Sequence, residues 1–481
     1  MNGVLGALAA GLVFLLGARW FSRGAGLLAA ALFVGYGPLL FFESKLLITP
    51  LAVLLSLALA GAARETACSG STRGRVLWAL GSGLLLGALA VCRANMLLAG
   101  VVLVVVWAVG TARGRTPAAV PAAFLAGALV FLGPVLVHNA RAGAFVPVAT
   151  QGGFNFYAGN HPGATGVYEG IPGVSGGIAS QEANADSVVA AAVGHVLDPA
   201  AESRYWTRRA WREIGEDPVS WAALLLRKAV LAASRVEETV NGNWLLERDR
   251  VPLLRLLALP WNLLLGLGLL GGGLAVRRRE RGLAGAGAVL LAVAVTCIGF
   301  FVMSRMRLPA AGVLAVFGGY ALSAGWASWR GGSRGRVLAT LAGLLVWTAL
   351  TWSSPLGASR NPAWGSQLFT TLGAEAERRG APYRALAAYA EAAQADPVAL
   401  EPRVRSGRLL MLAGKPAEAL EAYEAAHRIA PHDTRVANNL GIIYMNLERW
   451  ADADRVLSPL LETHPALPAP YYVRGRLAHE H

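Results

Sequence analysis

Long apolar runs alternate with short basic loops through the first 353 residues of this 481-residue chain. Each run comes close to the ~20 residues that a helix needs to cross a bilayer. We predict ten membrane-spanning helices, at residues 3–18, 24–41, 47–63, 76–92, 96–110, 119–137, 255–276, 282–303, 309–328 and 336–353. The predicted fold class is therefore an all-α polytopic membrane body, with its N-terminal part at 1–137 and its C-terminal part at 254–353.

The tail from residue 366 to 481, beyond a linker at 354–365, has a repeating sequence pattern. Four residue types recur there every 34 residues: Gly373, Gly407 and Gly441; Ala385, Ala419 and Ala453; Tyr389, Tyr423 and Leu457; and Pro397, Pro431 and Pro465. This step is typical of tetratricopeptide repeats, helical hairpins that stack into an α-solenoid. We expect three complete repeats, a fourth begun at Tyr471–His481, and a peptide or protein partner. A purely structural cap is the alternative.

One large polar segment, residues 138–253, separates the two groups of apolar runs. Its first half is rich in Gly and Asn, which favours loops and short strands. Its second half predicts two helices, Ala201–Ile214 and Val219–Arg235, the latter opened by Pro218. Four tryptophans in this half either lie at the membrane interface or pack on one another: Trp206, Trp211, Trp221 and Trp244.

The net charge of +14 and the 55% hydrophobic content must be interpreted together. The surplus arginines lie in alternate short loops: Arg19 and Arg23; Arg64, Arg73 and Arg75; Arg113 and Arg115; Arg277–Arg281; and Arg330–Arg336. Because positive loops stay in the cytoplasm, this asymmetry predicts an inner-membrane protein. It places 138–253, the repeats and both termini in the periplasm, and the charge requires no nucleic-acid partner.

Four polar clusters lie at the predicted outer ends of helices, where ionisable groups cost less than at membrane depth. In the first, Glu43 is a candidate catalytic base, or else it pairs locally with Lys45. In the second, Arg93 and Asn95 suit a phosphate, although an arginine there can also reach lipid headgroups. The short outer loops carry few other charges.

The remaining two clusters are a glycine-rich segment and an arginine pair. Asn155, Tyr157 and Asn160 lie in the segment Gln151–Pro162, which we interpret either as a loop that stacks on a sugar and binds its hydroxyls, or as a structural turn. Arg305 and Arg307 suit an anionic ligand such as a lipid phosphate, with headgroup anchoring as the alternative. Three unpaired cysteines and the lack of ligand spacing predict no metal site.

Together these residues resemble the bacterial membrane glycosyltransferases of family 39, the protein mannosyltransferase-like type with the GT-C fold. Many members carry tetratricopeptide tails. Five segments carry the resemblance: Phe41–Pro50, Gly87–Asn95, Gly153–Asn160, Asp217–Lys228 and Arg305–Pro309. The resemblance implies transfer of a sugar from a polyprenyl-phosphate carrier, the donor substrate, to a protein, lipid or glycan acceptor on the outer face. No other cofactor is expected.

The resemblance also implies roles for particular residues. Five would face the carrier phosphate: Lys45, Arg93, Asn95, Arg305 and Arg307. The segment 155–160 would face the sugar or the acceptor. The family's catalytic aspartate follows a first membrane helix, and this chain opens on what looks like the family's second or third helix. The resemblance then implies a truncated start or an inactive protein, with Glu43 as the substitute carboxylate.

Two alternative functions belong to other classes of protein. The first is a non-catalytic membrane-anchored scaffold whose repeats gather partners in an envelope complex. The second is a polysaccharide ligase or polymerase, which also joins many membrane helices to a large outer loop. The segment Arg305–Pro309 and the pair Arg93 and Asn95 favour the sugar transferase over the ligase.

Overall fold

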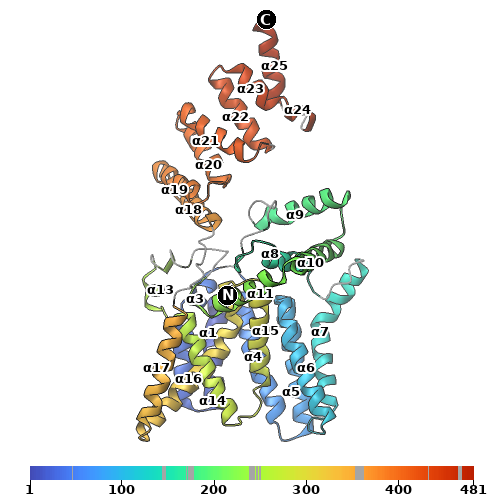
Figure 1. Ribbon diagram of the computed structural model, residues 1–481, viewed down its shortest axis with the longest axis vertical. Helices are drawn as coiled ribbons and strands as arrows, with labels where there is room; N and C mark the ends of the chain where they lie inside the picture. Colours follow the sequence, from blue (N-terminus) through green and yellow to red (C-terminus); the bar gives the residue numbers. More distant parts are fainter. Residues whose placement is uncertain are drawn as a thin grey trace. The chain divides into compact units, whose positions relative to one another are not determined.

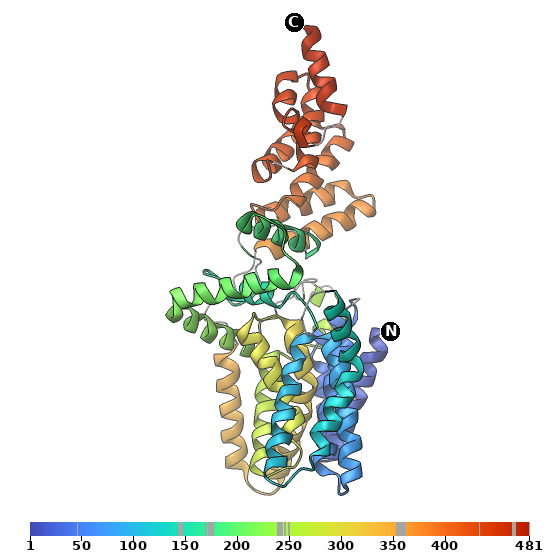
Figure 2. The ribbon, with the colours of Figure 1, turned by 90° about the vertical axis from the view of Figure 1, so that its right-hand side faces the viewer.

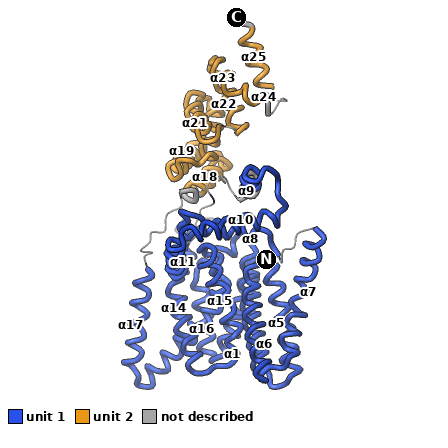
Figure 3. Tube along the Cα trace, turned by 45° about the vertical axis from the view of Figure 1, so that its right-hand side comes forward, with its two compact units in different colours: residues 1–358 blue, residues 359–481 orange. Residues whose placement is uncertain are grey.

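The computed structural model describes residues 1–45, 47–142, 148–168, 171, 178–237, 244, 247–248, 251–352, 362–431, 433–463 and 468–480. The chain divides into two compact units, residues 1–358 and 359–481 (Figure 3). Every regular element among the described residues is a helix, and extended backbone pairs there only in two isolated bridges, Tyr36–Ala258 and Val167–Val302. The all-α prediction is confirmed.

The first unit contains a bundle of side-by-side helices (Figures 1 and 2). Six described helices are long and apolar enough to cross a membrane: α1 (Asn2–Trp20), α4 (Thr49–Cys68), α5 (Thr72–Cys92), α6 (Leu97–Ala112) with the 3-10 turn Ala94–Met96 before it, α7 (Ala119–Arg141) and α16 (Ser304–Arg330). Three apolar helices are shorter: α2 (Arg23–Gly35), α14 (Trp261–Arg277) and α15 (Ala284–Gly299). The short α3 (Pro38–Glu43) follows α2, and α17 (Arg334–Leu350) follows α16. Each of the ten predicted runs overlaps a helix, but the number ten is not established.

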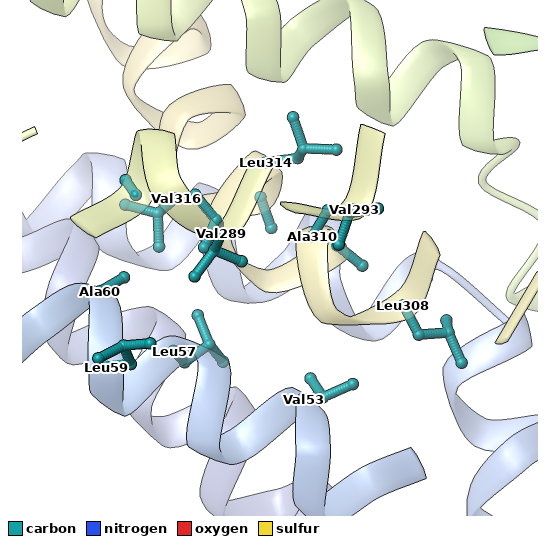
Figure 4. Close-up of a cluster of buried hydrophobic side chains, with 14 of the residues drawn as sticks. Val53, Leu57, Leu59, Ala60, Val289, Val293, Leu308, Ala310, Leu314 and Val316 are labelled. Atoms are coloured by element: carbon teal, nitrogen blue, oxygen red, sulfur yellow. The ribbon is translucent and has the colours of Figure 1, made fainter. Parts of the chain in front are cut away.

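Helix α16 forms the centre of the bundle. In α16 72% of the most apolar stretch is buried, against 22% in α7. Apolar side chains of α4, α15 and α16 meet there, and Figure 4 labels Val53, Leu57, Val289, Val293, Leu308 and Leu314 among them. Because lipid is as apolar as these side chains, close packing rather than water exclusion holds such helices together.

Glycines allow the closest helix pairs to form. A Cβ on Gly83 of α5 would collide with the Phe124 carbonyl of α7, and one on Gly271 of α14 with the Phe317 carbonyl of α16. Small residues at such contacts let two backbones approach within reach of dispersion forces. The many glycines of the apolar runs therefore include packing positions as well as turns.

Four helices form a cap at one end of the bundle: α8 (Gly152–Asn160), α9 (Ile178–Val193), α10 (Pro199–Glu216) and α11 (Pro218–Ala233) (Figure 1). The predicted helices are confirmed in α10 and α11, each with an aspartate N-cap and a proline at its start. The first half contains the expected loop at residues 161–168, but its described residues form no strand, and α8 and α9 occupy much of it. The short α13 (Pro252–Leu256) leads back into the bundle.

The tryptophans of this region were expected either to pack on one another or to lie at the membrane interface, and they differ in burial. Trp206 and Trp244 are buried, and Trp206 packs edge-on against Phe154 at a centroid distance of 5.9 Å. Trp211 in contrast is 55% exposed. Packing inside the protein therefore accounts for the first two, and an interfacial position stays a prediction for Trp211.

The second unit is a series of helices: α18 (Pro362–Arg378), α19 (Pro382–Ala395), α20 (Glu401–Leu412), α21 (Pro416–Ile429), α22 (Thr434–Asn446), α23 (Trp450–Leu457), α24 (Leu460–Thr463) and α25 (Pro468–Glu480). The 34-residue period has a direct physical cause. A Cβ on Gly373, Gly407 or Gly441 would strike the side chain sixteen residues later, which is Tyr389, Tyr423 or Leu457. Each glycine thus makes room for the large side chain of its own hairpin.

Candidate functional site

The sequence-predicted polar residues of the bundle gather at the end that carries the cap. The opposite end carries the basic loops between α4 and α5, α6 and α7, α14 and α15, and α16 and α17 (Figure 1). Arg93 follows α5, Ser304 begins α16, and Glu43 ends α3, all at the cap end. Helix ends rather than helix middles therefore position the candidate site.

Arg93 and Arg305 are brought together. The Arg93 guanidinium donates to the Thr49 hydroxyl at 3.0 Å and lies 3.6 Å from the Met306 sulfur, next to Arg305 in the chain. Burial and then the charge of Arg305 lower the pKa of the Arg93 guanidinium. The Arg93 Nε atom is buried without a hydrogen-bond partner among the described residues. Two half-buried cations thus lie close together.

Arg305 itself has no acidic partner within the described part of the chain. Two like charges repel one another, and a buried guanidinium with unused donors is costly. An anion between Arg93 and Arg305 would remove both costs, and each guanidinium fork matches the geometry of a phosphate. The pair is therefore a candidate anion site.

The Arg307 side chain, in contrast, is engaged by other groups of the protein. Its guanidinium forms an ion pair with Glu237 at 2.8 Å and donates to the carbonyls of Ser234 at 3.0 Å and Val236 at 2.5 Å. It also lies over the Trp261 ring, 5.0 Å from the centroid. Arg307 is only 1% exposed. These internal contacts occupy the side chain that the sequence assigned to the carrier phosphate.

Two other predicted phosphate ligands also have partners within the protein. The Lys45 ammonium forms an ion pair with Glu247 at 2.5 Å and lies 4.7 Å from the centroid of the Phe41 ring. Asn95 donates to the Thr296 hydroxyl of α15 at 3.0 Å. Each of these groups is therefore already engaged by a partner within the protein.

Glu43 occupies a small pocket of its own. Its carboxylate lies against Gly6 of α1, and Thr49 lines the same pocket. The cavity measures only about 10 Å³, close to the space that one water molecule needs. Burial raises the pKa of Glu43 to about 7. Thr49 therefore joins the Glu43 pocket to Arg93, to which its hydroxyl is hydrogen-bonded.

Three sugar-binding candidates share α8, which the sequence predicted as a loop. Asn160 is buried, and its amide donates to the carbonyls of Phe156 at 2.8 Å and Gly299 at 2.9 Å. The Tyr157 hydroxyl is buried and donates to Glu213 at 3.2 Å. Asn155 is half-buried and its side chain has no hydrogen bond recorded within the described residues. Of the three, Asn155 is the most available to a ligand.

Burial and the nearby Glu213 raise the pKa of Tyr157 to about 12. The guanidinium of Arg209 covers the Tyr157 ring, 4.9 Å from its centroid. The Trp206 ring lies tilted against the same ring, with 5.0 Å between the centroids. Tyr157 is therefore a neutral packing residue of the cap at physiological pH.

Lys228 of α11 completes the contacts of Asn160. Its ammonium donates to the Asn160 carbonyl oxygen at 2.8 Å, and the Trp221 indole donates to the same oxygen at 2.9 Å. Lys228 is inaccessible to solvent, and burial lowers its pKa to about 7. No acidic group pairs with it in the described part of the chain. Asn160 thus links α8, α11 and the end of α15.

This link holds the backbone that leads to Arg305. The segment between α15 and α16 is held at Gly299 by Asn160, and Val302 donates to the Gly166 carbonyl at 2.8 Å. A Cβ on Gly159 would strike the Phe300 carbonyl, so the cap packs directly on this segment. Arg305 follows three residues after Val302, and the cap therefore fixes the start of the turn that presents it.

The sequence analysis did not single out Thr49, Lys228 or Glu237. A signal exists for Lys228, because Arg227 and Lys228 together interrupt the otherwise apolar stretch 222–231. Thr49 lies within Phe41–Pro50, a segment that carries the family resemblance, but no role was assigned to Thr49 itself. Glu237 lies far along the chain from its partner Arg307, and nothing local marks it. Among the described residues no group of three His, Cys, Asp or Glu side chains is placed to hold a metal ion.

Comparison with known proteins identifies the tail only. The family model for the tetratricopeptide repeat matches residues 410–477. No curated protein matches the chain. Residues 410–477 are therefore tetratricopeptide repeat, a fold used for protein–protein contacts, attached to a body with several apolar helices consistent with a membrane protein.

Proposed function

We propose that this protein is a membrane glycosyltransferase that moves a sugar from a polyprenyl-phosphate carrier to a protein, lipid or glycan acceptor. The single observation that carries the proposal is the pair Arg93 and Arg305, two half-buried arginines that lie close together with no acidic partner among the described residues. A lipid phosphate at the membrane boundary is the anion that such a pair suits best. The arginine-rich loops at the other end support a cytoplasmic position for that end, and hence an extracytoplasmic site.

In the proposed reaction an acceptor hydroxyl attacks the anomeric carbon and the phosphate of the carrier leaves. Arg93 and Arg305 stabilise the negative charge that grows on that phosphate. Because Thr49 already holds the Arg93 fork, that fork needs little reorganisation when the bond breaks. Lys45, Asn95 and Arg307 act as positioning residues, since each is held by a partner within the protein.

Glu43 is the proposed base that takes the proton of the acceptor hydroxyl. A pKa of about 7 suits a base that works near neutral pH. Its pocket of about 10 Å³ admits about one water molecule, so an acceptor reaches Glu43 only when this end of the bundle opens. Asn155 is the proposed contact to the sugar or acceptor, and Tyr157 and Asn160 keep α8 in place.

Binding of carrier to purified full-length protein in zwitterionic nanodiscs tests the proposal. The probe is a fluorescent short-chain polyprenyl phosphate. We expect Arg93→Ala and Arg305→Ala each to weaken binding at least ten-fold, because each removes one of two phosphate contacts. The matched control is Arg281→Ala, an exposed arginine of the opposite end. Unchanged binding in both variants would remove the basis of the proposed function.

A non-catalytic scaffold is the second candidate, and the tetratricopeptide match carries it. The two candidates differ in one measurement. Incubation with a radiolabelled polyprenyl-phosphate sugar and a membrane extract as acceptor source yields labelled product only from a transferase. Retained partner binding with no transfer, and no carrier binding, would favour the scaffold.

A further inference from the structure

An arginine-lined groove lies in the cap, apart from the carrier site. It runs between the end of α9 and one face of α10, and its cavity volume is about 600 Å³. That volume falls within the range of ordinary ligand sites. Its polar lining is Tyr205 with Arg204, Arg208, Arg209 and Arg212.

Three of these arginines form a stripe along α10. Arg204, Arg208 and Arg212 are four residues apart, so their side chains leave the helix on one face at intervals of about 6 Å along its axis. All three are exposed. Like charges at this spacing destabilise a helix, so the stripe is not explained by the stability of α10.

Acidic side chains of the protein do little to neutralise the charges of this arginine stripe. Arg204 and Arg208 have no ion pair in the described part of the chain, and Arg212 only approaches Glu216 at 4.0 Å with both side chains about two-thirds exposed. Arg209 differs, because it pairs with Glu213 at 2.9 Å and covers the Tyr157 ring. Arg209 therefore holds the cap together while the stripe remains open to an anion.

The rest of the groove lining is apolar: Val193 at the end of α9, Leu197 between the two helices and Ala201 in the first turn of α10. An occupant should therefore present both negative charges and apolar groups to the groove. An extended peptide does so when acidic and apolar residues alternate, because successive side chains point to opposite faces. Alternate residues of such a strand lie about 7 Å apart, close to the spacing of the stripe.

We propose that the groove between α9 and α10 binds an extended acidic segment of a partner or acceptor protein. An anionic glycan would meet the arginines but offer no side chains to Val193 and Leu197. A lipid surface is flat, whereas this site is a groove. Binding at the groove is independent of sugar transfer, since the experiment below measures binding alone.

The test uses the full chain in zwitterionic nanodiscs. The probe is a fluorescein-labelled ten-residue peptide of alternating Glu and Val with one photoreactive benzophenone residue. We expect saturable binding that weakens as salt rises, and cross-links that map to residues 193–212. The same peptide with Gln for Glu is expected not to cross-link there. Site mapping separates this groove from the tetratricopeptide unit, which also suits peptides.

The triple variant Arg204→Gln, Arg208→Gln, Arg212→Gln should lose at least ten-fold in affinity at the mapped site. The control triple Arg73→Gln, Arg113→Gln, Arg115→Gln removes three exposed arginines from the basic loops and should bind as the wild type. Thermal unfolding checks that both variants fold. Should the first triple not fold, Arg208→Gln alone is expected to lose about three-fold or more.

Three outcomes would overturn the proposal. One is a stripe variant that folds and cross-links the acidic peptide as well as the wild type does. Another is arginine-dependent binding of an acidic oligosaccharide with no binding of the peptide. The third is stripe-dependent binding of the protein to vesicles of anionic phospholipid, again without peptide binding.

Discussion

Arg307 of α16 and Glu237, which lies beyond the end of α11, form an ion pair at 2.8 Å with exposed fractions of only 1% and 6%. The Tyr36 hydroxyl donates to the other Glu237 oxygen at 2.8 Å. Three segments far apart in the sequence thus meet around one carboxylate. A buried pair of this kind adds little stability over an apolar equivalent, but a member left alone is costly. The pair therefore serves to fix the position of the chain that follows α11.

Loss of the Glu237 carboxylate should strongly destabilise the first unit. In Glu237→Ala the guanidinium of Arg307 stays buried without its counter-charge, and we expect the unfolding free energy to fall by about 3–5 kcal/mol. The double variant Arg307→Met, Glu237→Met should lose less, because neither member is left charged. Thermal unfolding in detergent, followed by circular dichroism, measures the difference.

The matched control for this pair is Glu65→Ala. Glu65 pairs with Arg19 at 2.7 Å, but the Arg19 side chain is 68% exposed, so water replaces the lost contact. We expect no measurable change in Tm. Equal Tm values for Glu237→Ala and the wild type would show that the buried pair does not hold the bundle end.

Helices with strong local signals were predictable from sequence. Asp198 and Asp217 cap α10 and α11 because their carboxylates accept from the first free backbone amides. Helix α8 was missed for a physical reason. Its glycines suggested a turn, but Gly153 and Gly159 provide room for carbonyls of Ser203 and Phe300, on segments remote in sequence. Local composition cannot distinguish a packing glycine from a turn glycine.

The glycine of a repeat should resist even one added methyl group. A Cβ on Gly407 would lie 2.5 Å from the Tyr423 ring, so Gly407→Ala overpacks the hairpin of α20 and α21. We expect a loss of about 1–3 kcal/mol. Hydrogen–deuterium exchange of the full chain should show faster exchange confined to these two helices and their neighbours.

Gly475→Ala is the matched control for this prediction. Within the described residues, no atom of another turn or helix lies within 4 Å of a Cβ at that helical position, so alanine should be neutral or stabilise α25 by about 0.5–1 kcal/mol. Equal protection in Gly407→Ala and the wild type would mean that the hairpin tolerates the methyl group. The shared period would then need another explanation.

The candidate site was predictable only as residue types at helix ends. Polarity identified Arg93 and Arg305, and the structure brings them together. Arg307, two residues later, was assigned the same role, yet it pairs with a residue 70 positions away. Which of two neighbouring arginines remains free depends on such distant partners. No local pattern carries that information.

Lys228 should make stability depend on pH on the alkaline side of neutrality. Burial lowers its pKa to about 7 in the folded protein, below the 10.5 of an unfolded lysine. Between these values the unfolded chain binds more protons, so stability rises with pH and reaches its full value near pH 10.5. Lys228→Met should remove that slope and raise Tm most at pH 7 and below.

The control for pH effects elsewhere in the molecule is Lys415→Met, an exposed lysine paired with Glu418. It should leave the pH dependence of Tm as in the wild type. The decisive quantity is the difference in Tm between Lys228→Met and the wild type, measured from pH 6 to pH 10. A difference that stays constant over this range would show that Lys228 does not titrate there.

Glu43 should give a pH dependence of the opposite sign. Burial raises its pKa to about 7 in the folded protein, above the 4.5 of an unfolded glutamate. Between these values the folded protein binds more protons, so stability falls as pH rises and the loss is complete above pH 7. Glu43→Gln keeps the shape of the side chain without its charge, and its Tm should exceed that of the wild type at pH 8. The two Tm values should converge near pH 4.5.

Glu391→Gln, at an exposed position of the repeats, controls for charge removal in general. A Tm of Glu43→Gln that follows the wild type at every pH would place the Glu43 carboxylate in water and remove it as the proposed base.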